Sequence, residues 1–364
     1  MLESNKKLTG KRQIEIDILR GFAMLAVVSI HVSNIPMGNL VSGRRYFLVY
    51  MFNSFINFAV PIFFLISAIL AAYSQADRPM KLWPYYKKKL IRLGLPYLVW
   101  TLLYILFGVA IHRLRMPDIL SWRNWISWIL QGRAYEHLYF LAVICQFHVL
   151  FPILIKLARL VKDKPFWAFF IAIGGQHIVY WANKLWLYKA FPYFQSSFFW
   201  YFGTMFLGLY LGLNYEKVCL WLRRNVKWLT IPCIVSAIAY LYFRYMLYAD
   251  IPLHTYPYFF VMLFFVISLP LCLLAPAQNL RLQQGWVGRG LLWIGRYTLG
   301  IYLAHPVLNF FLRRWVKTGK LIPLFLICFA AVFVYTIVCG YITKLLEKYK
   351  LTSWIVGAPP SNKQ

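Results

Sequence analysis

Ten mostly apolar stretches of about 20 residues follow one another along this chain, and a helix of that length crosses the hydrocarbon core of a bilayer. No other feature of the sequence restricts the fold as strongly. The succession predicts an all-α fold, a polytopic membrane helix bundle of about ten transmembrane helices. The predicted spans are 16–35, 47–72, 91–111, 138–160, 166–183, 195–213, 228–248, 257–276, 291–312 and 321–343.

Composition supports one membrane domain over residues 1–364. Charged residues make up 13% of the chain, against about 25% in soluble domains. The 15 Trp and 26 Tyr are residue types that gather at membrane–water interfaces. Between the third and fourth spans, segment 113–137 carries tryptophans at three-residue spacing (Trp122, Trp125 and Trp128). This stripe predicts a short helix lying in the interface, anchored by its aromatic rings.

The net charge of +29 would indicate nucleic acid in a soluble protein. Here the basic residues lie mostly in short connections, where they set topology and contact anionic lipids. We therefore expect membrane lipids and no nucleic acid as partners. The termini and even-numbered connections, together with Lys156 and Arg159 at the end of the fourth span, hold 23 Lys and Arg, and the odd-numbered connections hold 12. Both termini are therefore predicted to be cytoplasmic in a plasma-membrane protein. Arg313, Arg314, Lys317 and Lys320 fall on the less basic side.

Ionisable residues within the first span are the leading functional candidates, because a charge in a bilayer costs several kcal/mol unless it is paired or solvated. Arg20 and His31 are eleven residues apart and share one helix face, about 16 Å apart along the axis. Asp17 is placed to pair with Arg20. Taken singly, Arg20 is interpreted as a snorkelling, topology-setting residue, and His31 equally well as an interhelical hydrogen-bonder. Together they favour a functional site.

Other polar residues carry two interpretations each. His137, beside Glu136 at the outer mouth of the fourth span, binds a sugar or is a solvated interfacial residue. His305, before Pro306, lines a cavity or bonds a carbonyl freed by the proline. Asn57, four residues after Asn53, points into the same cavity or holds helices together. By position, His148 and His177 are expected to make interhelical hydrogen bonds, and Arg244 and Arg296 to snorkel.

The first-span pattern, an arginine and a histidine separated by ten residues, resembles the signature of the acyltransferase-3 family of membrane O-acyltransferases. Further segments resemble that family in the same order, although Ala68 stands where glycine is usual and Lys89 where arginine is usual. They are Val60–Ala68 (VPIFFLISA), Lys89–Trp100 (KLIRLGLPYLVW), His137–Leu141 (HLYFL) and Tyr302–Pro306 (YLAHP). The likeness therefore runs through nearly the whole chain.

This resemblance implies transfer of a short acyl group, acetyl or succinyl, from cytoplasmic acyl-CoA to a hydroxyl of an envelope glycan or exopolysaccharide. It implies that His31 is the catalytic histidine, with Arg20 its partner, and that Lys89 and Arg92 bind the CoA phosphates. Lysine meets a phosphate as a point charge, whereas arginine grips it with two parallel hydrogen bonds. The acyl-CoA is then a donor substrate rather than a bound cofactor. The oligomeric state, monomer or homodimer, stays open.

The chemistry is consistent with the residues. A neutral imidazole accepts the proton of a weakly nucleophilic sugar hydroxyl as it attacks the thioester, and burial keeps His31 in that neutral form. The six cysteines show no zinc-binding spacing, and we expect no metal and no disulfides. The competing hypothesis is an exporter or flippase for a polysaccharide or lipid-linked sugar. We detect no internal repeat of the kind that many transporters carry.

Overall fold

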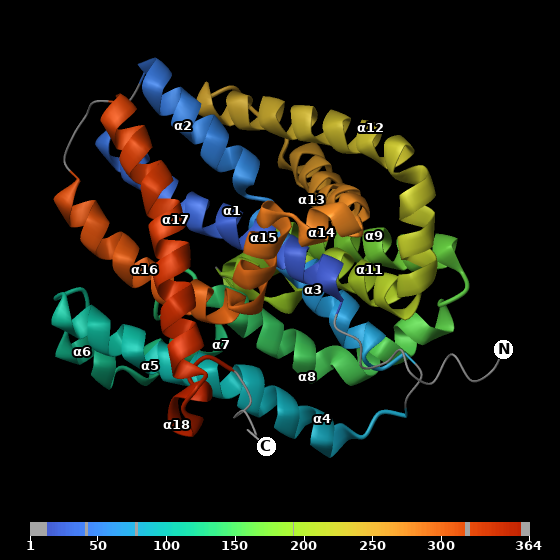
Figure 1. Cartoon of the computed structure of the whole chain (residues 1–364), viewed down its shortest axis with the longest axis horizontal. Helices are drawn as coiled ribbons and strands as arrows, with labels where there is room; N and C mark the ends of the chain where they lie inside the picture. Colours follow the sequence, from blue (N-terminus) through green and yellow to red (C-terminus); the bar gives the residue numbers. More distant parts are fainter. Residues whose placement is uncertain (1–12, 41–42, 77–78, 192, 317–320, 358–364) are drawn as a thin grey trace. The chain divides into compact units, whose positions relative to one another are not determined.

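The computed structural model of the chain describes residues 13–40, 43–76, 79–191, 193–316 and 321–357. Over these ranges the secondary structure is helical throughout, with no strand, as expected (Figure 1). The basic residues Lys317 and Lys320, on which part of the charge count rests, lie outside the described residues.

Seven segments are long and apolar enough to cross a membrane, and each coincides with a predicted span. The α-helical membrane bundle is therefore confirmed. The segments are α1 (Ile14–Asn39), α2 and α3 (Gly43–Ile56 and Ala59–Tyr73), α4 to α5 (Leu82–Lys89 and Leu95–Ala110), α8 (Tyr139–Leu160), α12 (Tyr215–Tyr248), α13 (Thr255–Ala277) and Pro323–Leu346 within α17 (Leu321–Leu346).

The other three predicted spans are shorter or interrupted helices. Span 166–183 corresponds to α9 (Pro165–Ala182), and span 195–213 begins as two 3₁₀ turns before α11 (Phe202–Leu213). Span 291–312 is not one helix, because α15 (Trp286–Arg296) ends and α16 (Thr298–Trp315) begins on either side of Tyr297. The hydroxyl of Thr298 donates to the carbonyls of Ile294 (3.1 Å) and Gly295 (2.8 Å). These bonds satisfy carbonyls that the ended helix leaves open.

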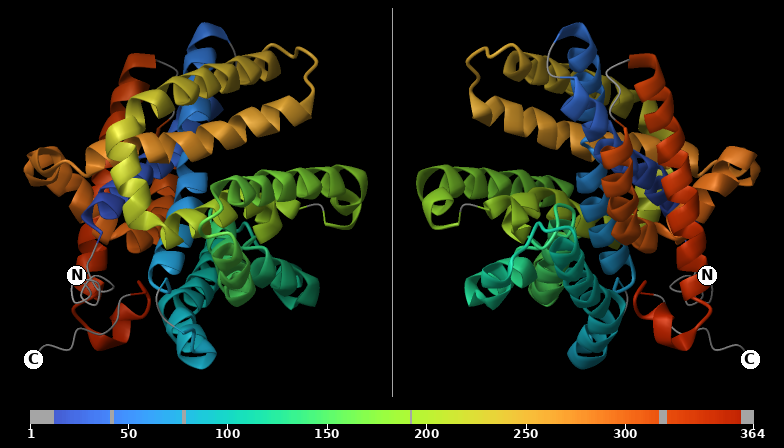
Figure 2. Two further views of the ribbon diagram at one scale, coloured as in Figure 1. Left: turned by 90° about the vertical axis from the view of Figure 1, so that its right-hand side faces the viewer. Right: turned by 90° about the vertical axis from the view of Figure 1, so that its left-hand side faces the viewer.

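The helices group into two compact units, Met1–Ile66 with Tyr215–Thr343 and Ser67–Asn214 with Lys344–Gln364. Within the first unit, α1 packs against α2, α13, α15 and α16. In the same unit, α12 and α13 lie side by side as a helical hairpin (Figures 1 and 2).

Close approach of α1 to α15 depends on two glycines. A Cβ on Gly21 would overlap the backbone carbonyl of Leu291, and a Cβ on Gly295 would overlap that of Asp17. The helices therefore touch backbone to backbone at the turn that carries Asp17 and Arg20.

In the second unit, α9 and α11 are joined through buried Gln176. Its side-chain oxygen accepts from the backbone N–H of Gly203 (2.8 Å), and its amide nitrogen donates to the carbonyl of Trp200 (3.2 Å). The short helix expected within 113–137 is present as α7 (Trp122–Leu130). Its Trp128 is buried, and the Tyr97 hydroxyl donates to the Trp128 carbonyl (3.0 Å). That this helix lies in the interface stays a prediction.

Replacing Gly295 with alanine should destabilise the first unit, because the added methyl group forces α15 away from α1. Overpacking of this kind costs about 1–3 kcal/mol, so we expect a lower thermal unfolding midpoint in detergent. Gly290→Ala is the matched control on the same helix, since nothing lies within 4 Å of a Cβ at Gly290. An unchanged midpoint for Gly295→Ala would show that the two backbones are not in contact.

Candidate active site

The N-terminal end of α1 carries the expected ion pair. Arg20 Nη1 lies 3.3 Å from Asp17 Oδ1, one helical turn away. The Asp17 side chain is 9% exposed and that of Arg20 is 35% exposed. Because the pair lies where α1 meets Gly295 of α15, the arginine is anchored at its base by a buried carboxylate while its side chain stays partly accessible.

Farther along α1, His31 lies against His305 of α16. The two ring centroids are 5.0 Å apart, with the planes inclined by 61° in an edge-on contact. His31 is half-buried and His305 is fully buried. Tyr302, His305 and Asn309 recur at helical spacing and so share one face of α16, and Asn309 and His305 of that face both contact the His31 turn.

The hydrogen bond of His305 fixes its tautomer. Its Nδ1 lies 2.9 Å from the carbonyl oxygen of Ile301. A carbonyl only accepts, so Nδ1 carries the proton and Nε2 of the neutral ring carries the lone pair. The proline at 306 frees the carbonyl of Tyr302, so the Ile301 bond is not the one that the sequence predicted. The ring of His305 lies beside that of His31.

The turn of α1 that holds His31 is fixed by side chains from three other helices. Asn53 of α2 donates to the carbonyl of Ile30 (3.1 Å), and Asn309 of α16 donates to the carbonyl of His31 itself (3.1 Å). The thiol of Cys328 in α17 points at the carbonyl of Val32 (3.8 Å). Val32 lies four residues before Pro36, which has no N–H to close that helical bond. Three consecutive carbonyls of α1 therefore have partners from outside the helix.

Asn57 lies one turn beyond Asn53, and its amide donates to the Asn53 carbonyl (2.8 Å) and side-chain oxygen (3.2 Å). These two bonds stay within the same segment, so it is Asn53, through the Ile30 carbonyl, that links α2 to α1. A substrate contact of Asn57 stays a prediction.

The expected phosphate-binding residues belong to the second unit. Lys89 ends α4, and Arg92 lies in η2, the π-helical turn Leu90–Gly94 that joins α4 to α5. Lys89 Nζ lies 5.6 Å from the ring centroid of Tyr85, whose hydroxyl is hydrogen-bonded to Nδ1 of His148 (2.8 Å). That bond confirms the interhelical role predicted for His148. Arg92 is exposed, and π-helical turns are frequent at functional sites.

His137 is not a solvated interfacial residue, as one interpretation had it. It is 2% exposed and packs edge-on against Tyr104 (4.9 Å between centroids) and Tyr135 (5.7 Å). The histidine of the HLYFL segment is buried just before α8 begins, whereas the neighbouring Glu136 is exposed.

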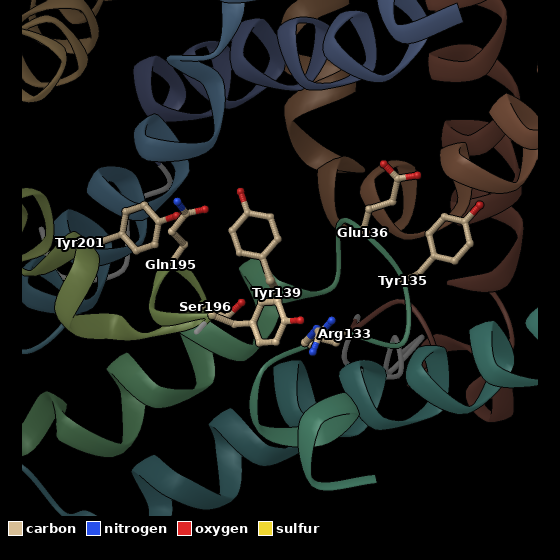
Figure 3. Close-up of a pocket in the computed structure, with 9 residues that line it drawn as sticks. Arg133, Tyr135, Glu136, Tyr139, Gln195, Ser196 and Tyr201 are labelled. Carbon is tan, nitrogen blue, oxygen red and sulfur yellow. The ribbon is translucent and has the colours of Figure 1, made fainter. Parts of the chain in front are cut away.

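A pocket of about 340 Å³ opens beside this segment (Figure 3). It lies between residues 132–139 and residues 193–201. Figure 3 shows Tyr139, Gln195 and Tyr201 gathered at one end and Tyr135 at the other. Sequence reasoning chose His137 here and missed the residues that do line the pocket. Tyr139 lies within the HLYFL segment, but the motif drew attention to its histidine, and Gln195 and Tyr201 belong to no motif. The main lining residues are Arg133, Tyr135, Glu136, Tyr139, Gln195 and Tyr201.

Arg244 has partners on a neighbouring helix, and its predicted reach to the membrane interface stays a prediction. It is half-buried, its Nε donates to the hydroxyl of Ser54 in α2 (2.9 Å), and its guanidinium lies 4.8 Å from the centroid of Tyr50. Its role in the first unit is to join α12 to α2. Among the described residues, no group of three or more His, Cys, Asp or Glu side chains is placed to hold a metal ion.

A family model described as an acyltransferase domain matches residues 13–344. This chain belongs to the acyltransferase-3 family. The match includes both ends of the α1 signature, Arg20 and His31, together with His305 of α16. In this member of the family, the arginine of the α1 pattern is paired with a carboxylate one turn away. The histidine of the pattern lies in a turn that side chains of three other helices contact.

Relatives of this family member include proteins of Staphylococcus aureus strains MRSA252 and MSSA476. Each is 21% identical over 368 residues, which cover 96% of this chain and 97% of the relative. Both bear the name "Probable poly-beta-1,6-N-acetyl-D-glucosamine export protein". No solved structure matches the chain.

Replacing Asn309 with alanine should slow acyl transfer if His31 takes part in the reaction, as the sequence predicts. The change removes the donor that fixes the His31 carbonyl, and small displacements of a reacting group lower the rate. We expect kcat to fall about tenfold with the Kd for the acyl donor unchanged. Asn225→Ala is the control, since that exposed amide bonds only its own helix, at Trp221. Equal kcat values for the two variants would contradict the positioning role.

Proposed function

We propose that this protein is a membrane O-acyltransferase that moves an acetyl or succinyl group from cytoplasmic acyl-CoA to a hydroxyl of an envelope glycan or exopolysaccharide. His31 is the catalytic base. The observation that carries the proposal is the placement of His31 beside His305, in an α1 turn fixed by α2, α16 and α17. Family membership supplies the reaction class.

In the proposed step, the acceptor hydroxyl oxygen attacks the thioester carbonyl carbon while its proton passes to a ring nitrogen of His31. The new C–O bond forms, the C–S bond breaks, and the imidazolium returns the proton to the departing sulfur as CoA thiol. The buried ring of His305 stands edge-on to His31. Holding His31 by its backbone and by this ring limits the orientations from which it accepts the proton.

On the donor side, the proposal assigns the CoA phosphates to Lys89 and Arg92. The connection before the third span is one of those that the charge count places in the cytoplasm. Lys87 and Lys88 precede the pair on α4 and are exposed, as is Arg92. A cluster of cations at this helix end favours an anionic ligand, with one guanidinium able to bind a phosphate through two hydrogen bonds.

On the acceptor side, the names of the relatives point to a polymer of β-1,6-linked N-acetylglucosamine or a related exopolysaccharide. Transfer would occur at the outer face of the plasma membrane, with both termini in the cytoplasm. We take membrane lipids as the surrounding partners, and the activity is compatible with a monomer or a homodimer.

His31→Ala should abolish O-acylation while leaving the glycan outside the cell. Loss of a general base lowers the rate about 10²–10⁴-fold. The measurement is the acyl content of the extracellular glycan together with its total amount, in cells with equal membrane levels of each variant. His177→Ala is the control, because this histidine also lies on a hydrophobic helix and bonds the carbonyl of Ile173 on that helix. Acylation that persists in His31→Ala would refute the proposed catalytic role.

Replacing both Lys89 and Arg92 with glutamine should weaken acyl-CoA binding by about tenfold or more, since charged hydrogen bonds contribute about 1.5–3 kcal/mol each. Lys87 and Lys88, changed together to glutamine, remove the same charge from the same helix end. Titration of acyl-CoA into purified protein compares the two pairs. If both double variants lose affinity equally, the effect is general electrostatics and the specific phosphate contacts are wrong.

A second candidate function is export of the polysaccharide, and the names of the relatives favour it. The His31→Ala experiment separates the two candidates. An exporter whose path depends on this site loses extracellular glycan, whereas an acyltransferase loses acyl groups and keeps the polymer.

A further inference from the structure

The pocket of the second unit is lined by groups that both donate and accept hydrogen bonds. Tyr139 and Tyr201 contribute hydroxyl groups. Gln195 adds an amide and Ser196 a further hydroxyl. Such a set matches a ligand whose own groups donate and accept, as sugar hydroxyls do. Tyrosine rings also present flat apolar faces with a polar edge, which suits the two faces of a pyranose.

The charges in the pocket disfavour an anionic ligand. Glu136, when ionised, only accepts hydrogen bonds, so it takes hydroxyl or amide donors and repels a phosphate or carboxylate. The guanidinium of Arg133 lies 3.3 Å from the ring centroid of Tyr193, stacked on that face. It therefore joins the two lining segments across the pocket by a cation–π contact. A neutral, hydroxyl-rich ligand fits this balance better than the CoA phosphates do.

The two lining segments are held in place by one side chain of α8. The amide nitrogen of Gln146 donates to the carbonyls of Leu130 and Ser196, both at 3.0 Å. Its oxygen accepts from the backbone N–H of Phe198 (2.8 Å). Gly132 makes the turn between α7 and α8 at φ +68°, so close to the Tyr139 backbone that no Cβ fits. The walls are thus positioned before a ligand arrives, which lowers the entropic cost of binding.

The volume of the pocket and its predicted side of the membrane agree with binding of a sugar from outside the cell. The volume of about 340 Å³ falls within the range of about 300–1,000 Å³ found for small-ligand sites. Both lining segments belong to odd-numbered connections or to the helix ends next to them, which the count of Lys and Arg places outside the cell.

We propose that this pocket binds one sugar residue of the glycan. Naming that glycan as the acyl acceptor rests on the function proposed above, whereas sugar binding at this site does not. Glu136 and Gln195 bond the sugar hydroxyls or its N-acetyl group, and Tyr139 and Tyr201 orient the ring.

The test measures binding directly, without acyl-CoA, on the full-length protein in lipid nanodiscs. The probes are short oligomers of β-1,6-linked N-acetylglucosamine, β-1,4-linked glucose and α-1,6-linked glucose, followed by ligand-observed NMR. Glu136→Gln and Gln195→Ala should each weaken binding about tenfold or more, and Tyr139→Phe less. Glu136 and Gln195 are exposed, so their replacement leaves the fold intact. Tyr188→Phe, an exposed tyrosine in the same connection outside the pocket, should bind as the wild type does.

The outcomes separate this proposal from the catalytic one. If His31→Ala stops acylation and still binds the probe, both proposals hold. If His31→Ala keeps acylation while Glu136→Gln loses the probe, the pocket is a sugar site and the assigned base is wrong. Wild-type protein that binds none of the three probes overturns the pocket proposal, and so do Glu136→Gln and Gln195→Ala variants that bind as tightly as Tyr188→Phe.

Discussion

The rest of the first unit depends on one turn of α1, Ile30–Val32, whose three carbonyls are contacted by side chains of other helices. In hydrocarbon an unsatisfied carbonyl costs several kcal/mol, and Pro36 removes the N–H that would serve Val32. The carbonyls of Ile30, His31 and Val32 are approached by side chains of α2, α16 and α17. Side chains of three helices thus meet α1 at one turn, next to the carbonyl that Pro36 leaves without its helical donor. His31 lies at the centre of this turn. The backbone of the proposed catalytic residue is therefore held by side chains from three other helices.

The opposite end of α1 is fixed by a different interaction. There the glycines at 21 and 295 let two backbones touch, and the Asp17–Arg20 pair lies on that contact. A helix held at both ends keeps its charged and titratable residues about 16 Å apart along the axis. On the proposed function, this fixed span separates a cation near the cytoplasm from a base deeper in the membrane.

Much of this arrangement was readable from the sequence, and the failures have physical causes. Arg20 and His31 stood out because charge is rare in apolar helices. The seven helices that can cross a membrane were marked by their length and apolar composition. The break at Tyr297 was not predicted, because it depends on the Thr298 hydroxyl, which bonds the last carbonyls of α15. The pocket was missed because Tyr139 and Gln195 lie at the starts of two helical segments far apart in the chain. Burial of His137 likewise depends on tertiary packing with Tyr104.

The state of His305 bears on whether the histidine pair serves chemistry or transport. Intramembrane histidines also occur in proton relays of pumps and transporters. A relay passes a proton into one ring nitrogen and out of the other, so both nitrogens must be available in turn. Nδ1 of His305 is committed to the Ile301 carbonyl, and passing a proton through the ring would break that bond inside a fully buried site. A general base beside it needs only one exchanging nitrogen. The fixed tautomer therefore favours acid–base chemistry at His31 over a proton path through the pair.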